Sequence, residues 1–135
     1  MLLDDLADRL TTAGVANTGT TLFKGTMPST PDELMALYQT GGPSPVHAMA
    51  AGPGSAVVER PHVQIVARAL RADSASFLAQ KAYHALDALG DVTLNGIRYL
   101  SVYALHTPFF LRRDESNRVE YVCNYEIVRE TATSS

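Results

Sequence analysis

The chain has 135 residues, of which 46% are hydrophobic, and its 11 basic and 14 acidic residues give a formal net charge of −3. This length supports one domain with one core and is too short for two ordinary domains. Lys24 and Lys81 are the only lysines, so the clustered positive charge that phosphate-driven nucleic-acid binding requires is missing. Cys123 is the only cysteine, which excludes an intrachain disulfide and a thiolate zinc site and leaves a buried free thiol as our expectation.

The N-terminal residues lack the cationic start and the apolar run of a signal peptide. No apolar stretch in the sequence is long enough to cross a bilayer. We therefore expect a soluble protein that is made in a reducing cytoplasm and does not bind a membrane.

The first predicted element is a helix that ends near Gly14, since glycine accepts the left-handed conformation that closes many helices. Two acidic residues lie in its first turn, where they complement the helix dipole. The apolar residues recur at three- and four-residue steps and so share one face: Leu3, Leu6, Ala7 and Leu10.

Two strands are predicted next. Residues 18–25 are rich in β-branched and aromatic side chains, which favours a strand. Residues 32–40 are ambiguous, because an acidic pair after Pro31 resembles a helix start. The alternation of Leu34, Ala36 and Tyr38 favours a strand instead, and we prefer that interpretation.

A segment rich in glycine, proline and small residues runs from Gly41 to about Ala56. A connection of this length without periodicity is uncommon in a compact domain and usually serves a function or moves. It is either a hairpin excursion without a task or a segment that becomes ordered against a neighbouring subunit.

The second half predicts a strand, a helix and a set of strands that ends in a hairpin. The strand begins at Pro61, with Val63, Ile65, Ala67 and Ala69 on one face. For the helix we expect Asp73 or Ser74 as the N-cap and Gly90 as the stop, with an apolar stripe between them. The last strands are predicted to begin at Asn95, to turn at residues 114–118 and to return to Arg129.

This order of elements predicts an α+β fold, in which a mostly antiparallel sheet carries two helices on one face, with a long Gly/Pro-rich loop. We expect residues 1–130 to form a single domain. The small polar residues 131–135 are predicted to form a loose, disordered tail.

No catalytic or metal-binding pattern is present. The four histidines, His47, His62, His84 and His106, lack the spacing that places two metal ligands on one helical face. The Gly52–Ser55 stretch lacks the ending and the context of a phosphate-binding loop. We therefore predict no catalytic residue, no metal site and no cofactor.

The turn at the end of the chain carries charges of both signs in Arg112, Arg113, Asp114, Glu115 and Arg118. Such a turn is either an ordinary solvated hairpin with mutually screened charges or a protruding patch that docks on a partner of complementary pattern. Tyrosines at same-parity positions of the two strands beside this turn are expected in the core, although tyrosine is also favoured at protein contacts: Tyr99, Tyr103, Tyr121 and Tyr125.

Four stretches in this order resemble the tail terminator (tail completion) and minor capsid proteins of long-tailed bacteriophages. The resemblance covers roughly residues 18–130. The stretches are Pro31-Asp32 leading into Leu37–Gly42, then Glu59–Arg68, Asn95–Tyr99 and Pro108–Arg118.

The resemblance implies a structural, non-enzymatic virion protein without a cofactor, assembled in the host cytoplasm. It implies a homo-oligomer, a hexameric ring at the head-proximal end of the tail tube. The ring would stop tube polymerisation, join a head-completion protein, and let DNA pass through a channel without specific binding. A head-closure or connector role, or a small enzyme or ligand-binding domain, remains an alternative.

We predict subunit contacts along the sheet edges and tube contacts from the long loop and the charged turn. The predicted interface residues are Gly41, Gly42, Pro43, Met49, Arg112, Arg113, Asp114, Glu115 and Arg118.

Overall fold

The structure, a computed structural model, describes residues 2–44, 46–47 and 56–130. Within these residues it contains two helices and a nine-stranded sheet. The helices are α1 (Leu2–Thr12) and α2 (Ala72–Leu86). The strands are β1 (Leu22–Lys24), β2 (Leu34–Gly41), β3 (Val46–His47), β4 (Ala56–Glu59), β5 (His62–Ala69), β6 (Val92–Leu94), β7 (Ile97–Ala104), β8 (Phe109–Arg113) and β9 (Val119–Glu130).

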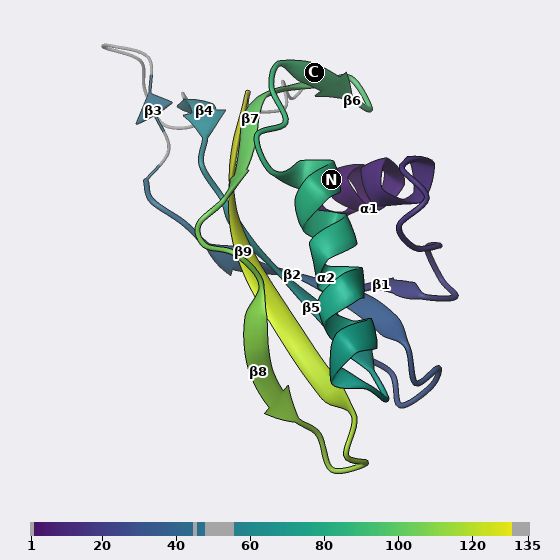
Figure 1. Ribbon diagram of the computed structural model, residues 1–135. Helices are drawn as coiled ribbons and strands as arrows, with labels where there is room; N and C mark the ends of the chain where they lie inside the picture. The colour runs from purple at the N-terminus through teal and green to yellow at the C-terminus, as the bar shows by residue number, and fades with distance from the viewer. Residues whose placement is uncertain (1, 45, 48–55, 131–135) are drawn as a thin grey trace.

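The long strand β9 organises the sheet (Figure 1). One of its sides pairs with β5 and then β4, and its other side pairs with β8 and then β7, all antiparallel. Beyond β5 lie β2 and, parallel to it, β1. The predicted α+β fold with a mostly antiparallel sheet is confirmed.

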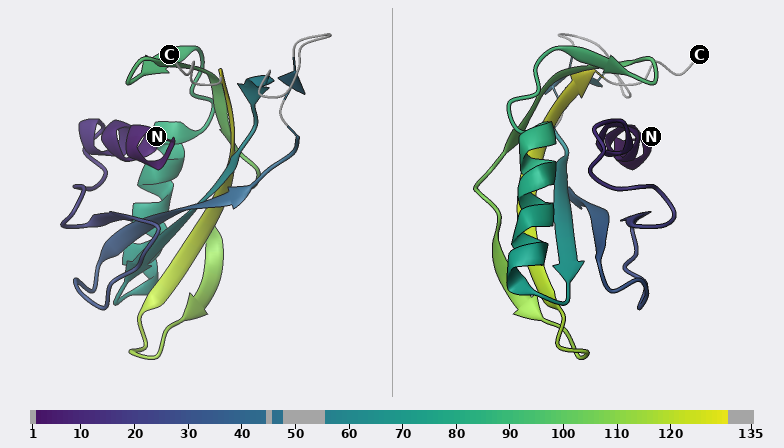
Figure 2. Two further views of the ribbon diagram at one scale, coloured as in Figure 1. Left: turned by 180° about the vertical axis from the view of Figure 1, so that it is seen from behind. Right: turned by 45° about the vertical axis from the view of Figure 1, so that its right-hand side comes forward.

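Both helices lie on one face of this sheet (Figure 2). Helix α2 packs along β5 and β9, and α1 packs on β1, β2 and α2. The core between these layers contains Leu6, Leu10 and Leu86 from the helices and Ile65 and Tyr125 from the strands. Cys123 is buried in the same core as a free thiol, as predicted.

Helix α2 begins and ends earlier than the sequence predicts. Its N-cap is Arg71, without a side-chain capping bond, so Asp73 and Ser74 lie inside the first turn. The helix ends at Leu86, ahead of Gly90, because Ala88 has a φ of 58°. An alanine in the left-handed region cannot continue the helix. The Asp87 carboxylate accepts the backbone N–H of Ala104 at 2.8 Å and so fixes this end against β7.

The residues predicted to start a strand, Asn95 and Gly96, instead form the tip of the β6–β7 hairpin. Their φ angles of 50° and 81° are both positive, as a two-residue hairpin turn with the twist of the strands requires. A register shift between Tyr99 and Ser101 then breaks the predicted alternation. Tyr99 is therefore buried while Tyr103, which we expected in the core, is 39% exposed.

In the first half, residues 32–40 lie in a strand, as we preferred, because β2 spans Leu34–Gly41. The predicted strand over residues 18–25 is limited to β1, since residues 17–21 form a turn held by the Asn17 carbonyl. The predicted loop after Gly41 contains β3 and the start of β4, and its residues 48–55 lie outside the described residues, as do 131–135.

Candidate assembly surface

The charged turn between β8 and β9 is a rigid structure. Asp114 accepts the backbone N–H groups of Ser116 at 3.0 Å and Arg118 at 2.8 Å through one carboxylate oxygen. Its other oxygen accepts the Arg118 Nε–H at 2.8 Å. Asn117 takes a left-handed φ of 61°, which asparagine tolerates better than most residues. Asp114 thus holds the backbone of the turn through three hydrogen bonds.

The predicted interface residues of this turn fall into two groups. Arg113 and Glu115 are exposed, and the Arg112 side chain is 64% exposed, with its Nε bonded to the buried Glu120 at 3.1 Å. The side chains of Asp114 and Arg118 are only 13% and 9% exposed. Arg112, Arg113 and Glu115 therefore face outward, while Asp114 and Arg118 hold the backbone that presents them.

Burial raises the pKa of Asp114, but the N–H and the guanidinium of Arg118 outweigh it and hold that pKa below its ordinary value. The carboxylate therefore stays charged and keeps its bonds at neutral pH.

Two buried arginines hold the loop that precedes β2, Arg68 from β5 and Arg118 from the charged turn. The guanidinium of Arg68 donates to the carbonyls of Pro28, Pro31 and Asp32 at 2.7–3.2 Å. Arg118 donates to the carbonyl of Ser29 in the same loop. Burial and the nearby Arg118 lower the pKa of Arg68. The sequence did not predict this role, although an arginine within the apolar run of β5 is a signal that a partner must be buried with it.

The other predicted cluster lies at the opposite end of the sheet. Gly41, Gly42 and Pro43 are exposed and follow β2, whereas Met49 lies outside the described residues. Gly41 of β2 pairs with His62 of β5, which in turn pairs with Glu126 of β9, whereas Arg112 of β8 pairs with Glu120 of β9. Glu120 and Glu126 are six residues apart along β9, a distance of about 20 Å. The structure therefore does not bring the two predicted tube contacts together.

Strand β8 forms an apolar surface that was not among the predicted contact residues. All five of its residues are exposed, with Phe109, Phe110 and Leu111 at 46%, 50% and 42%. Leu105, immediately after β7, is 45% exposed. Three consecutive large apolar residues after Pro108 were the available signal, because few soluble surfaces expose such a run.

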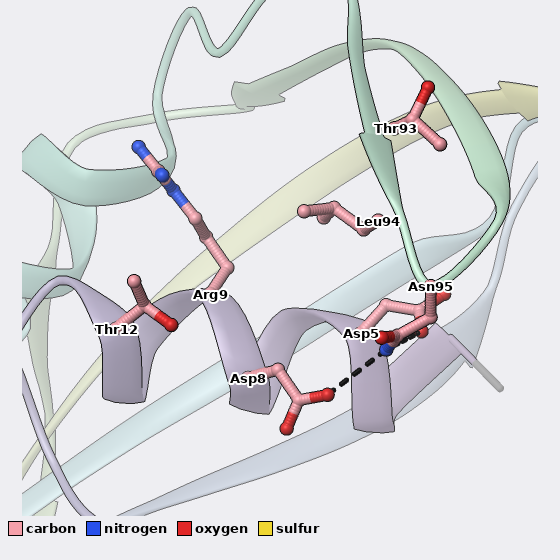
Figure 3. Close-up of a pocket in the computed structure, with 7 residues that line it drawn as sticks. All are labelled: Asp5, Asp8, Arg9, Thr12, Thr93, Leu94 and Asn95. Atoms are coloured by element: carbon pink, nitrogen blue, oxygen red, sulfur yellow. Dashed lines mark hydrogen bonds between the residues drawn. The ribbon is translucent and has the colours of Figure 1, made fainter.

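The hollow beside α1 and the β6–β7 hairpin is a structural junction (Figure 3). It has a volume of about 220 Å³. The Asn95 amide donates to Asp5 at 2.7 Å and Asp8 at 3.0 Å, and the Tyr99 hydroxyl donates to Asp5. Burial and the bond to Asp5 raise the pKa of Tyr99. These groups bond to one another, and the hollow holds no nucleophile paired with a base.

Among the described residues, no group of three or more His, Cys, Asp or Glu side chains is placed to hold a metal ion. No helix in this part of the chain has the length and apolar character to span a membrane. Among the described residues, the candidate surfaces for contacts with other proteins are the charged turn at residues 112–118 and the exposed edge strand β8.

The family model of the bacteriophage tail terminator protein matches residues 9–131. The protein belongs to this family, and the predicted resemblance is confirmed. A chain in the virion of a native gene transfer agent particle has a similar fold, with a TM-score of 0.62 and 17% identity over 96% of this chain and 95% of that chain. A comparison with curated proteins gives no match. The protein is thus a structural component of a phage tail, a class that implies a non-enzymatic role in the virion.

Proposed function

We propose that this protein closes the head-proximal end of the phage tail tube as an oligomeric ring. The ring stops tube polymerisation and offers its other face to a head-completion protein, while DNA passes through a central channel. A hexamer is the ring that the family resemblance implies. Family membership over residues 9–131 is the observation that carries this proposal.

The separation of the two predicted contact clusters supports a subunit whose two ends contact different partner proteins. The turn of Arg112, Arg113 and Glu115 lies at one end of β9, and Gly41–Pro43 lie at the other. A terminator must contact a tube on one side and a head protein on the other. We propose that the rigid charged turn meets the tube, because paired charges on a fixed backbone select a partner of complementary pattern.

Deletion of the gene tests the proposal. We expect unjoined heads beside tails of uncontrolled length, and tails of normal length would overturn the terminator function. Heads that leak DNA beside tails of normal length would indicate a head-closure role instead. Complementation with Arg113→Glu should fail to restore tail length, whereas the matched variant Arg71→Glu, at an exposed arginine before α2, should restore it.

Self-association is the second readout. Light scattering after size-exclusion chromatography should give a closed oligomer at high protein concentration, or a monomer that assembles when purified tail tubes are added. A protein that stays monomeric and does not bind tubes would contradict the ring.

A further inference from the structure

The edge strands β1 and β8 differ in whether another strand can reach them. At β1, the Leu22 N–H donates to the Asn17 carbonyl and the Leu22 carbonyl accepts the Gly19 N–H, both at 2.9 Å. The turn of residues 17–19 thus covers that edge. Strand β8 pairs with β9 on one side, and its outer side has no strand partner among the described residues.

The open edge of β8 is also apolar. Phe110 packs edge-on against Tyr121, and Phe109 packs beside His106, yet each keeps about half of its surface exposed. Leu111 lies at a register shift, where β8 has an extra residue opposite β9. An exposed edge of this kind invites pairing with another chain, so proteins cover it, shorten it or charge it. In β8 the charges are confined to Arg112 and Arg113 at the end of the strand, and residues 109–111 carry none.

A second edge is open at the other end of the molecule. Strands β3 and β4 form an antiparallel hairpin at the end of the sheet opposite β8 (Figures 1 and 2). β3 pairs with β4 alone among the described residues.

The charges around these edges are compatible. The sequence from Leu34 to Val58, which includes β3, contains no Asp, Glu, Lys or Arg. It can therefore be buried beside Phe109–Leu111 without leaving a charge unpaired, and it does not repel Arg112 or Arg113. A charged strand would bring a charge beside the apolar residues of β8, and a basic strand would also repel Arg112 and Arg113.

We propose that the β3 edge of one copy pairs with the β8 edge of the next copy. The two edges lie at opposite ends of one sheet, so a chain cannot join them within itself. The contact is heterologous, with different surfaces on the two partners, and such contacts close into rings when the rotation between copies allows. Strand addition supplies the backbone bonds, and the apolar side chains of β8 supply the buried surface. This inference rests on the proposed ring and names the contact that builds it.

Photo-cross-linking in assembled particles tests the contact. A benzophenone amino acid replaces Phe110 in one preparation and Phe77, which is 63% exposed on α2, in the control. After irradiation, cleavage behind Glu33 and Glu59 releases the segment 34–59 as one peptide. We expect the probe at position 110 to cross-link this peptide from a second copy and the probe at position 77 to give no such product.

A probe at Leu111 repeats the experiment in case the change at Phe110 prevents assembly. Cross-links from positions 110 and 111 to a different peptide of this chain, or to the tube protein, would overturn the β3–β8 contact. Tail length in the same particles is scored separately. Normal tails with the wrong cross-link would leave the terminator function standing, whereas a normal tail in the deletion strain would remove that function itself.

Leu111→Lys provides an independent measurement, with Leu70→Lys as the control because Leu70 is 60% exposed elsewhere. We expect about a tenfold weaker self-association or binding to capped tails for Leu111→Lys and less than about a twofold change for Leu70→Lys. Equal effects of the two variants would contradict a contact at β8.

Discussion

Gly42 lies so close to the backbone of Arg60 that a Cβ atom at position 42 would collide with the Arg60 carbonyl oxygen. The close approach occurs where the chain leaves β2 and passes the junction of β4 and β5. Gly42 also has a φ of 139°, in the region that favours glycine. Glycine is therefore required at position 42 for two reasons: a Cβ atom has no room there, and the backbone φ angle disfavours other residues.

Gly42→Ala should destabilise the fold more than Gly41→Ala. Gly41 has a φ of 109° as well, but nothing lies within 4 Å of its Cβ position. Both variants carry backbone strain, and only Gly42→Ala adds a collision with backbone that cannot move aside easily. We expect an additional loss of about 1–3 kcal/mol in the free energy of unfolding, measured in urea. Equal losses of unfolding free energy for the two variants would show that the backbone φ angle alone, and not the collision with Arg60, makes glycine necessary at position 42.

Arg118→Met should cost about 3–5 kcal/mol of stability, because it leaves the poorly exposed Asp114 carboxylate and the Ser29 carbonyl without their partner. Arg113→Met, on the exposed side of the same turn, should change stability by less than about 0.5 kcal/mol. Urea unfolding of both variants gives the comparison. If Arg118→Met matched Arg113→Met, the turn would not depend on this pair.

The stability of the turn should depend on pH through Asp114. Its pKa in the folded chain lies below the ordinary value of about 4. The stabilisation is therefore complete above about pH 4 and is lost as the pH falls through the lowered pKa, since protonation then favours the unfolded chain. The urea midpoint of Asp114→Asn should fall less between pH 6 and pH 3 than that of the unsubstituted protein. Glu115→Gln, exposed on the same turn, should keep the full dependence.

Two buried tyrosines should respond differently to loss of their hydroxyl groups. The Tyr99 hydroxyl bonds to the buried Asp5 and accepts from Arg129 at 3.2 Å, so Tyr99→Phe should cost about 1–3 kcal/mol. The Tyr125 hydroxyl is buried without a hydrogen-bond partner among the described residues. Tyr125→Phe should therefore be neutral or slightly stabilising in thermal unfolding. A larger loss for Tyr125→Phe than for Tyr99→Phe would contradict this difference between the two hydroxyl groups.

Asp5 itself is the centre of that network. It lies 3.9 Å from the Arg129 guanidinium, which also donates to Glu59 at 3.4 Å. Asp5→Leu should cost about 3–5 kcal/mol, since Arg129 would keep its burial and lose its nearest core carboxylate. Asp8→Leu, exposed one turn further along α1, should cost less than about 1 kcal/mol. Thermal unfolding distinguishes the two.

The sequence predicted elements that depend on neighbours along the chain. The strands β5 and β9, the apolar stripes of both helices and the turn at residues 114–118 follow from local patterns, and all of them appear in the structure. The alternation in β5 stops after Ile65, since Val66 and Arg68 are buried as well. The boundaries of α2 were wrong because its end is set by Ala88 and by the bond from Asp87 to Ala104, a residue on another strand.

By itself, the sequence determined an α+β fold without a recognisable catalytic pattern and a resemblance to tail terminators, because spacing and residue type carry both. Only the tertiary structure decided which charged residues are available to a partner. Arg113 and Arg118 are alike in sequence, yet one is exposed and the other is buried against a loop 89 residues away. Tertiary structure likewise separated Gly41–Pro43 from the charged turn and left β8 open while closing β1. Pairing between distant strands sets all of these outcomes, and no local pattern encodes that pairing.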